Sequence, residues 1–438
     1  MTARFITGFE NKPLNFSDHP DLEDSFRATV RNFQDEKTLG LHFARGGICP
    51  GNFIGMVWIG AGESRVALQV NSKFEDEEMD YIKMFAECAA HPEIGARLGG
   101  CLHFWADEEL IDAPEDSDFL ILTALAYLRE LNELCRRHLR RHFLRETRNF
   151  CGKVKGKILV GENLRQNIVR ARPDRIVCEY QNVGDDILEN RVLRAALERA
   201  ARYISRHKLR EHSRDFSAAE RWIRSCRAAL SCVPISPIHR SDFSSVRRRG
   251  AFVFYRKPLA LAKAVLLSFG FNPRKDIPEK TKTPPFALDS AELFERYAQL
   301  KLLEQFPNLR ALYERGTISG GNADGFDFPV RPDFYISREN EQPPQIIDAK
   351  YKRFSVPQNE KNADEKDNGD FYQIVAYSRH RGLLEKMRCR AEDEIKLSLA
   401  YPRIGESGGA AIQEENKTGA FLRDVHILKI ECPKKPAD

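Results

Sequence analysis

The sequence predicts an α/β (α+β) multidomain protein with a β-rich N-terminal domain, a helical connector and a C-terminal domain built on a mixed sheet. Runs rich in Val, Ile and Phe stand near the N-terminus, and long segments with apolar residues at the helical period follow. The last third mixes both patterns in the order helix, three strands, helix, strand, which is typical of an α/β sandwich. We expect domains at residues 1–155, 156–284 and 285–438.

Composition indicates a globular protein without membrane spans. The chain has 438 residues, 42% of them apolar and 30% charged, so two or three domains with ordinary cores are expected. The net charge of +5 is modest, so any basic surface must be local. No apolar run approaches 18 residues, and the N-terminus lacks the pattern of a signal peptide. The ten cysteines form no C-x-x-C pair, which favours reduced thiols in an intracellular protein.

The first region contains two strand-like segments and a long helical segment. "FIGMVWIG" and "RVALQVNSKF" alternate or run apolar, which predicts strands. A leucine stripe predicts one helix over residues 118–146. Basic residues are concentrated in residues 126–158. The surface that they form is either solvated or in contact with phosphates or a protein partner.

The middle region, residues 156–280, is predicted to be mostly helical. "ENRVLRAALERAARYISRHKL" places its apolar residues on one face of a helix. The arginines at 247–249 stand before an apolar segment and form a candidate phosphate clamp. Prolines and charges in residues 272–285 then indicate a linker.

The third region predicts a mixed sheet with helices. We expect helices over residues 289–306 and 370–386. The expected strands lie near Leu312 and over residues 326–336, 345–354, 395–402 and 425–432.

Two acids and a lysine stand on neighbouring strands of this sheet. Side chains alternate along a strand, so Asp348 and Lys350 share a face with Ile346. A hairpin through "RENEQPP" would bring Asp333 beside Asp348. Two convergent carboxylates raise each other's pKa unless a cation joins them, and hard oxygen ligands suit Mg²⁺ or Mn²⁺. Lys350 could position a metal-activated water or stabilise charge on a phosphorane. For each of these residues taken alone, the alternative to a catalytic role is that it stands at this position by chance.

Two further polar residues are candidates for the same site. Glu295 lies at the buried edge of the helix over residues 289–306, where it either faces the metal or is a plain surface charge. Asp289 can cap that helix. Gln373 falls in an apolar helix, where an unpaired amide would be costly, so we expect it to bond phosphate, water or Lys350.

These residues resemble the PD-(D/E)XK nuclease superfamily, and more narrowly the McrC nuclease subunits of McrBC-type modification-dependent (type IV) restriction systems. The four motifs that carry the resemblance are "LFERY", "RPDFYI", "DAKYKRF" and "DFYQIVAYS". The segments "FLRETRNFCGKVKGKI" and "RIVCEYQNVGDDILENRVLRAAL" resemble the same family. The resemblance implies a restriction-endonuclease-like core in which the metal is held by Asp333, Asp348, the backbone carbonyl of Ala349 and Glu295. It also implies catalytic roles for Lys350, which serves the attacking water, and for Gln373.

The resemblance further implies a partner and a substrate. McrC subunits associate with McrB, a hexameric AAA+ GTPase, through an N-terminal domain that enters the ring and stimulates GTP hydrolysis. The present chain lacks G-x-x-x-x-G-K-[ST], so GTP is expected only through that partner. The expected substrate is double-stranded DNA, methylated or otherwise modified, in antiviral defence in the cytoplasm of a bacterium or archaeon. Candidate DNA contacts are Arg247, Arg248, Arg249, Lys352 and Arg353.

Two alternatives remain open at the level of the sequence. One is a stand-alone repair or resolvase-type nuclease of the same superfamily, which would cut without nucleotide. The other is a non-catalytic regulatory scaffold of a ring NTPase, against which the intact set of two acids and a lysine argues.

Overall fold

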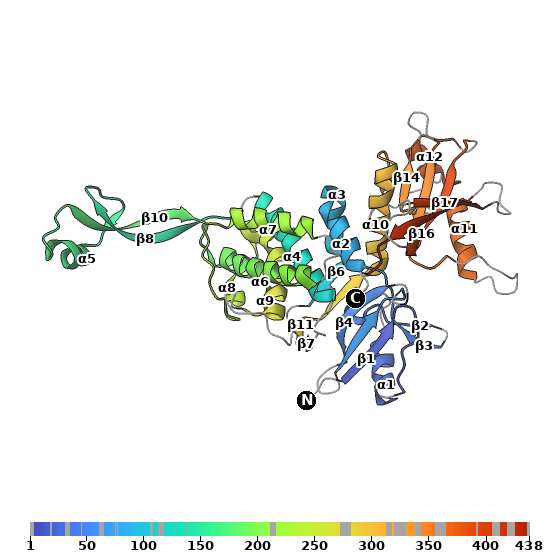
Figure 1. Cartoon of the computed structure of the whole chain (residues 1–438), viewed down its shortest axis with the longest axis horizontal. Coiled ribbons are helices and arrows are strands. Elements are labelled where there is room, and N and C mark those ends of the chain that lie inside the picture. The colour runs from blue at the N-terminus through green and yellow to red at the C-terminus, as the bar shows by residue number, and fades with distance from the viewer. Residues whose placement is uncertain are drawn as a thin grey trace, which may run out of the picture. The chain divides into compact units, whose positions relative to one another are not determined.

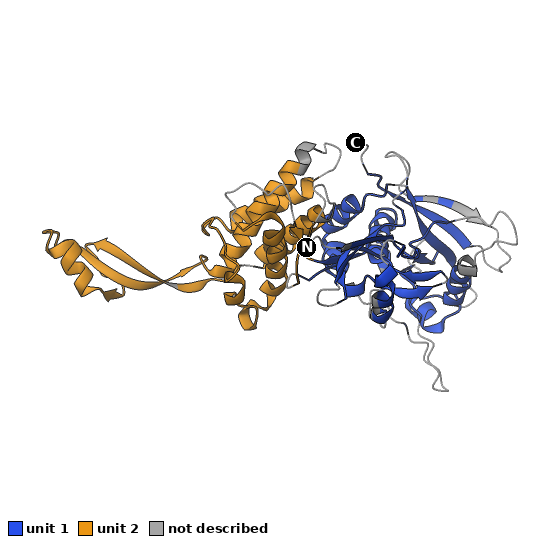
Figure 2. Cartoon of the chain, turned by 90° about the horizontal axis from the view of Figure 1, so that it is seen from below, with its two compact units in different colours: residues 1–105, 213–215, 285–438 blue, residues 106–212, 216–284 orange. Residues whose placement is uncertain are grey.

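The computed structural model divides the chain into two compact units. Unit 1 comprises Met1–Trp105, Ser213–Asp215 and Pro285–Asp438, and unit 2 comprises Ala106–His212 and Phe216–Pro284 (Figure 2). The first 105 residues therefore group with the C-terminal region, which differs from three consecutive domains. The structure describes residues 4–17, 20–30, 36–44, 46–60, 65–74, 76, 78–105, 108–112, 118–137, 139–210, 216–271, 282–311, 318, 330–337, 343–354, 365–390, 393–404, 412–417 and 425–435.

A five-stranded sheet forms the N-terminal part of unit 1. Its order is β1-β5-β4-β12-β6, with β1 parallel to β5 and the other neighbours antiparallel. The strands are β1 (Arg4–Phe9), β4 (Phe53–Ile59), β5 (Val66–Asn71), β6 (Leu102–Phe104) and β12 (Phe286–Asp289). The two strands predicted near residues 53–60 and 65–74 are confirmed as β4 and β5. The strand β12 comes from beyond the predicted linker and pairs with β4 and β6, so it joins this sheet directly to the C-terminal region.

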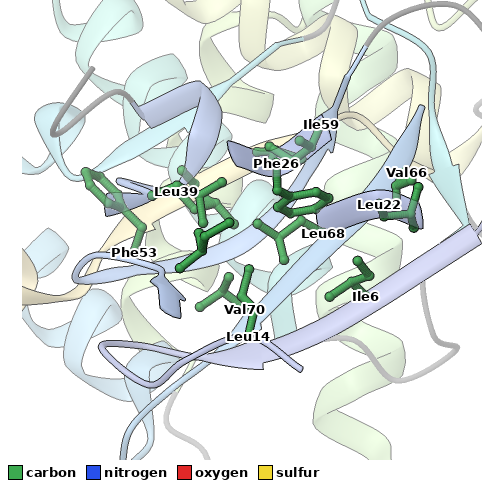
Figure 3. Packing of buried hydrophobic residues seen from close by; sticks show 14 residues of the cluster. Ile6, Leu14, Leu22, Phe26, Leu39, Phe53, Ile59, Val66, Leu68 and Val70 are labelled. Carbon is green, nitrogen blue, oxygen red and sulfur yellow. The ribbon is translucent and has the colours of Figure 1, made fainter. Parts of the chain in front are cut away.

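Helix α1 (Pro20–Thr29) covers one face of this sheet. Leu22 and Phe26 on the helix pack with Leu68 and Val70 of β5 and with Ile6 of β1 (Figure 3). These side chains are buried, as the apolar alternation along the strands requires. The other elements of this part are α2 (Tyr81–Ala90), α3 (Pro92–Gly95), β2 (His42–Ala44) and β3 (Gly47–Cys49).

The C-terminal part of unit 1 holds a six-stranded mixed sheet of order β13-β14-β15-β16-β18-β17. Its strands are β13 (Arg310–Ala311), β14 (Phe334–Ile336), β15 (Gln345–Ala349), β16 (Lys396–Ile404), β17 (Ile412–Lys417) and β18 (Val425–Cys432). Its helices are α10 (Ser290–Gln305), α11 (Glu365–Tyr377) and α12 (Arg381–Met387). The mixed α+β architecture is confirmed. The single helix predicted over residues 370–386 is wrong, because His380 has an extended backbone and its side chain caps α12. Leu312 lies outside the described residues.

A helical body forms most of unit 2. Its helices are α4 (Asp118–Arg136), α6 (Leu188–Arg210), α7 (Ser217–Ala229), α8 (Asp242–Ser245) and α9 (Arg256–Phe269), and β7 (Ile111–Asp112) pairs with β11 (Lys282–Thr283). The prediction of one helix over residues 118–146 is wrong at its C-terminal end: α4 ends at Arg136, and the chain is extended from His142. Arginines and histidines dominate residues 136–142, so no apolar stripe continues the helix there.

A two-stranded arm runs from this helical body. Strand β8 (His142–Cys151) pairs along its whole length with β10 (Arg175–Gly184), and β9 (Lys157–Ile158), α5 (Val160–Asn163) and a helical turn over Leu164–Ile168 lie at its far end (Figure 1). The prediction of a mostly helical middle region is therefore wrong for β9 and β10, whereas residues 160–168 between them are helical. None of the helices in the described part of the chain combines the length and hydrophobicity that crossing a bilayer requires.

Candidate active site

A hairpin of the six-stranded sheet brings the two predicted aspartates together. Strands β14 and β15 are antiparallel with Phe334 opposite Ile347, so Asp333 and Asp348 lie next to each other where the paired segments end. The backbone N–H of Ala349 donates to Asp333 Oδ2 at 2.7 Å. Asp348 is buried in the strand, with 3% of its surface exposed. The sequence prediction that the hairpin would place these carboxylates side by side is confirmed.

Lys350 follows directly at the end of β15. Its backbone N–H donates to Ala400 O of β16 at 2.8 Å, which continues the parallel pairing of the two strands. Its ammonium forms an ion pair with Asp348 Oδ2, as expected for residues that share a strand face. The same ammonium donates to Gln373 Oε1 of α11 at 2.8 Å. Lys350 is therefore held between the acid of its own strand and the amide of a helix.

Helix α10 contributes the acid Glu295. Asp289 caps this helix by accepting the N–H of Glu292 at 2.8 Å, as predicted. Glu292 Oε1 lies 2.9 Å from Arg296 Nη2, and Glu295 Oε1 lies 3.2 Å from Arg296 Nη1. Glu295 thus reaches the site while paired with a buried arginine, a partner that sequence reasoning missed.

Helix α11 supplies a chain of hydrogen bonds that orients Gln373. The Tyr377 hydroxyl donates to Arg331 O at 3.3 Å, which leaves it free to accept from Gln373 Nε2 at 2.7 Å. The amide oxygen of Gln373 then faces the Lys350 ammonium. Gln373 is exposed at its position on α11, in contrast to the buried amide expected, but it bonds Lys350 as predicted.

Sequence reasoning missed Tyr377 and Asp370 on the same helix. Asp370 Oδ2 lies 2.6 Å from Lys352 Nζ, and its Oδ1 lies 4.0 Å from Lys350 Nζ. Residues 370, 373 and 377 are spaced three and four apart, which puts them on one helix face. That spacing around Gln373 is the signal that could have identified both residues.

One cleft of about 550 Å³ within unit 1 is lined by Asp333, Asp348, Lys350, Glu295, Gln373 and Tyr377. Burial, together with the nearby charges of Asp348 and Glu295, raises the pKa of Asp333 well above its ordinary value. Burial also raises the pKa of Asp348, against the opposing charge of Lys350. The pKa of Glu295 is raised by burial, although Arg296 opposes the shift. The cleft therefore concentrates negative charge that a cation would relieve.

The donor set fits a hard divalent cation of the Mg²⁺ type. Among the described residues no group of three His, Cys, Asp or Glu side chains forms a ready-made metal centre. Mg²⁺, however, is usually held by one or two carboxylates together with waters and substrate phosphates. Asp333 and Asp348 supply the two carboxylates, and the backbone of Ala349 lines the same cleft. Glu295 lies close enough to influence the pKa of Asp333, but Arg296 already engages it.

The candidate DNA contacts lie in both units. In unit 2, Arg247 makes a two-pronged ion pair with the buried Glu189, at 2.8 and 3.0 Å, so its guanidinium has an internal structural role. Arg249 is exposed, and Arg248 is half-buried. In unit 1, Lys352 pairs with Asp370, and Arg353 Nη2 lies 3.6 Å from Asp76 Oδ2.

The raised pKa of Asp333 predicts that Asp333→Asn stabilises the metal-free protein at alkaline pH. A raised pKa means that the folded state binds the proton more tightly than the unfolded chain, so this stabilisation is lost as pH rises through the folded pKa. Asparagine is neutral and keeps an oxygen to accept the Ala349 N–H. In EDTA at about pH 8 the variant should melt about 2–4 °C above the parent, and the difference should disappear toward about pH 4. A variant that melts lower at alkaline pH would show that Asp333 is not under charge strain.

Comparisons with known proteins agree with the predicted family. The McrBC 5-methylcytosine restriction system component family matches residues 50–386. A chain of the half-complex of Thermococcus gammatolerans McrB AAA+ hexamers with bound McrC has a TM-score of 0.39 and 16% identity, covering 98% of this chain and 94% of that one. A chain of the Thermococcus gammatolerans McrBC complex has a TM-score of 0.33 and 17% identity, covering 70% of this chain and 90% of that one.

These two structural likenesses are too low to carry an argument of their own. No curated protein matches the chain at a significant level. The family match extends over most of the chain, from the strand region of unit 1 through unit 2 to α12. The chain therefore belongs to the McrBC 5-methylcytosine restriction system component family.

Proposed function

We propose that this chain is the McrC-type, Mg²⁺-dependent endonuclease subunit of a modification-dependent restriction complex that cuts phosphodiester bonds of DNA. The observation that carries the proposal is the meeting of Asp333, Asp348 and Lys350 in one cleft. Two buried carboxylates beside a lysine suit metal-assisted hydrolysis of a phosphodiester. Membership of the restriction family supports DNA as the substrate.

The residues of the cleft divide the chemistry between them. Asp333 and Asp348 would hold the metal, which would polarise a phosphoryl oxygen and activate a water for attack. Lys350 places a positive charge at the position where negative charge develops on the phosphoryl group. Gln373 and Tyr377 keep that ammonium oriented through their hydrogen bonds. Arg296 pairs with Glu295 at the wall of the cleft. We therefore assign Glu295 a supporting role and assign direct coordination of the metal to the two aspartates.

The arm of unit 2 is the docking element that we propose for the AAA+ GTPase partner. The small sheet β8-β10-β9 of the arm holds one buried apolar cluster, Phe150, Cys178 and Tyr180. Apolar side chains are exposed along the arm and at its far end, namely Phe143, Val154, Ile158, Val160, Leu164, Ile168, Val169 and Val183. Six of these, from Val154 to Val169, lie at the far end of the arm, and exposed apolar side chains gathered in this way favour a surface that another protein covers. McrB AAA+ hexamers are the partner present in the structure of the related complex.

The proposed activity predicts a strict dependence on the divalent cation. The full chain with its GTPase partner should nick modified plasmid DNA with Mg²⁺ or Mn²⁺ and GTP. Ca²⁺ should support less than about 1% of that rate, because its longer and more numerous ligand bonds do not suit a site of two carboxylates. Rates measured over a titration of each metal in matched buffer check this. Equal cutting with Ca²⁺, or cutting in excess EDTA, would contradict the metal mechanism.

The same assay separates the subunit from a stand-alone nuclease. A stand-alone enzyme would cut at full rate without the GTPase and without GTP, whereas a subunit requires both. A gene for a Walker-motif GTPase beside the gene for this chain would give the same answer. A non-catalytic scaffold would stimulate the GTPase while leaving the DNA intact under every condition.

A further inference from the structure

A buried glutamate of the N-terminal sheet lies at the centre of a hydrogen-bond network behind the cleft. Glu10 directly follows β1 and is fully buried. Its Oε1 accepts the hydroxyl of Ser290, and its Oε2 accepts the N–H of Lys73 and the hydroxyl of Tyr351, each at 3.1 Å. All of these residues belong to unit 1.

The three donors suit an ionised carboxylate, which only accepts hydrogen bonds. Burying such a charge is costly unless it is hydrogen-bonded and compensated. Lys73 supplies the compensation, since its charge opposes the rise in the pKa of Glu10 that burial causes. The Lys73 ammonium also lies 4.0 Å from the ring centre of Tyr351 and donates to the carbonyl of that residue. Because the buried Glu10 carboxylate needs all of these partners, the network holds the segments that carry them in one relative geometry.

Tyr351 is the immediate neighbour of Lys350 and is fixed along its whole length. Its hydroxyl contacts Tyr81 at 2.7 Å in addition to Glu10. Its ring packs against Phe74 and Phe294, with centroids 5.1 and 5.9 Å away. Tyr351 is buried. Tyr351 follows Lys350 directly in the chain, and the N–H of Lys352 donates to Lys350 O across it, so the anchoring of Tyr351 restrains the backbone from which the Lys350 side chain extends.

Ser290 ties the same carboxylate to the acidic helix. It is the first residue of α10, and its backbone N–H donates to the O of Asn52, directly before β4, at 3.1 Å, while its hydroxyl proton goes to Glu10. Glu295 lies on the second turn of that helix. A single carboxylate thus joins the two segments that carry Glu295 and Lys350.

We propose that Glu10 is a positioning residue for the cleavage reaction, acting through Tyr351 and Ser290 to set Lys350 and helix α10 relative to the two aspartates. This inference rests on the proposed nuclease function. It makes the N-terminal sheet a part of the catalytic scaffold, so the C-terminal region is incomplete without β1 and the Lys73–Tyr81 segment. A shift of about 1 Å at a reacting group is enough to lower a rate about 10²-fold.

Two variants of the full chain test the proposal. Tyr351→Phe removes the hydroxyl and keeps the ring, and Glu10→Gln replaces an acceptor oxygen by a donor that opposes the donors around it. Each variant should lower kcat for DNA nicking about 10- to 100-fold, with KM for DNA changed less than about twofold, because geometry and not DNA binding is altered. Stimulation of the partner GTPase should stay at the parent level.

Tyr255→Phe is the matched control. Tyr255 is a buried tyrosine of unit 2 whose hydroxyl accepts the Arg140 N–H at 2.6 Å and donates to Asn190 Oδ1 at 3.1 Å. Its loss should cost stability without lowering kcat per folded molecule. If Tyr351→Phe lowers kcat no more than this control, the proposal is overturned. If Glu10→Gln fails to fold, Tyr351→Phe decides alone.

Hydrogen exchange separates this inference from the nuclease assignment. The N–H groups of Lys350 and Lys352 donate to Ala400 O and Lys350 O, both at 2.8 Å. In Tyr351→Phe these amides should exchange at least about tenfold faster, whereas the β18 amides should not change. If the parent protein cuts no DNA, the proposed function fails. Faster exchange would then still support the positioning contact, and unchanged exchange would refute it.

Discussion

Lys350→Ala and Asp348→Asn should each abolish DNA cleavage while the protein remains folded and bound to its partner. The Lys350 ammonium contacts Asp348 and Gln373. The other cations that line the cleft are Arg331 and Arg296, and Arg296 is already paired with Glu292 and Glu295. Removing a charged group that stabilises the transition state costs about 10²–10³-fold in kcat. Asp348→Asn removes one of the two candidate metal carboxylates, so the loss should be at least as large.

The measurement is single-turnover nicking of plasmid DNA at saturating Mg²⁺, together with thermal melts and co-elution with the GTPase. Lys434→Ala is the matched control, because Lys434 is a lysine of unit 1 whose ammonium lies 3.1 Å from Glu78 outside the cleft. The control should retain full cleavage. If Lys350→Ala cleaves within about threefold of this control, Lys350 has no catalytic role. If Asp348→Asn cleaves normally, Asp348 is not a ligand of the catalytic metal.

The core of the candidate site could be predicted from the sequence because it depends on local structure. Alternation along one strand places Asp348 and Lys350 together, and a short hairpin brings Asp333 beside them. The capping of α10 by Asp289 is equally local. Each of these features depends on residues within about one hairpin or one helical turn, where period and turn chemistry are informative.

The features that escaped prediction depend on distant parts of the chain. Strand β12 has four residues after a pair of prolines, and it becomes a strand by pairing with β4, more than 200 positions earlier. In the sequence, nothing distinguishes Glu10 from a surface acid, because its partner Tyr351 is 341 positions away. The helix predicted over residues 118–146 runs into β8, whose buried Phe150 packs with Cys178 and Tyr180 of β10, a strand more than 20 positions later. Tertiary pairing overrode local preference in all three cases.

Replacing two exposed valines at the far end of the arm should uncouple the chain from its GTPase partner. Val160 and Val169 are 66% and 79% exposed, and they flank the helical turn over Leu164–Ile168. A fully buried valine contributes about 1.5–3 kcal/mol, so the combined Val160→Ser and Val169→Ser variant should bind the GTPase about 10²-fold more weakly. GTP turnover of the partner, titrated with the full chain, measures the change. Both residues are already exposed, so the melting temperature of the chain alone should be unchanged.

Val253→Ser is the matched control, because Val253 is 54% exposed on the helical body of unit 2 and outside the arm. It should bind and stimulate like the parent. The N-terminal docking domain expected from the sequence covers residues 1–155, which include β8 but exclude its partner strand β10, so a fragment ending at residue 155 would divide the arm. The full-length variant avoids that ambiguity. If it stimulates GTP turnover as the parent does, the arm is not the docking element, and the sheet formed by the first 105 residues becomes the surface to test by the same titration.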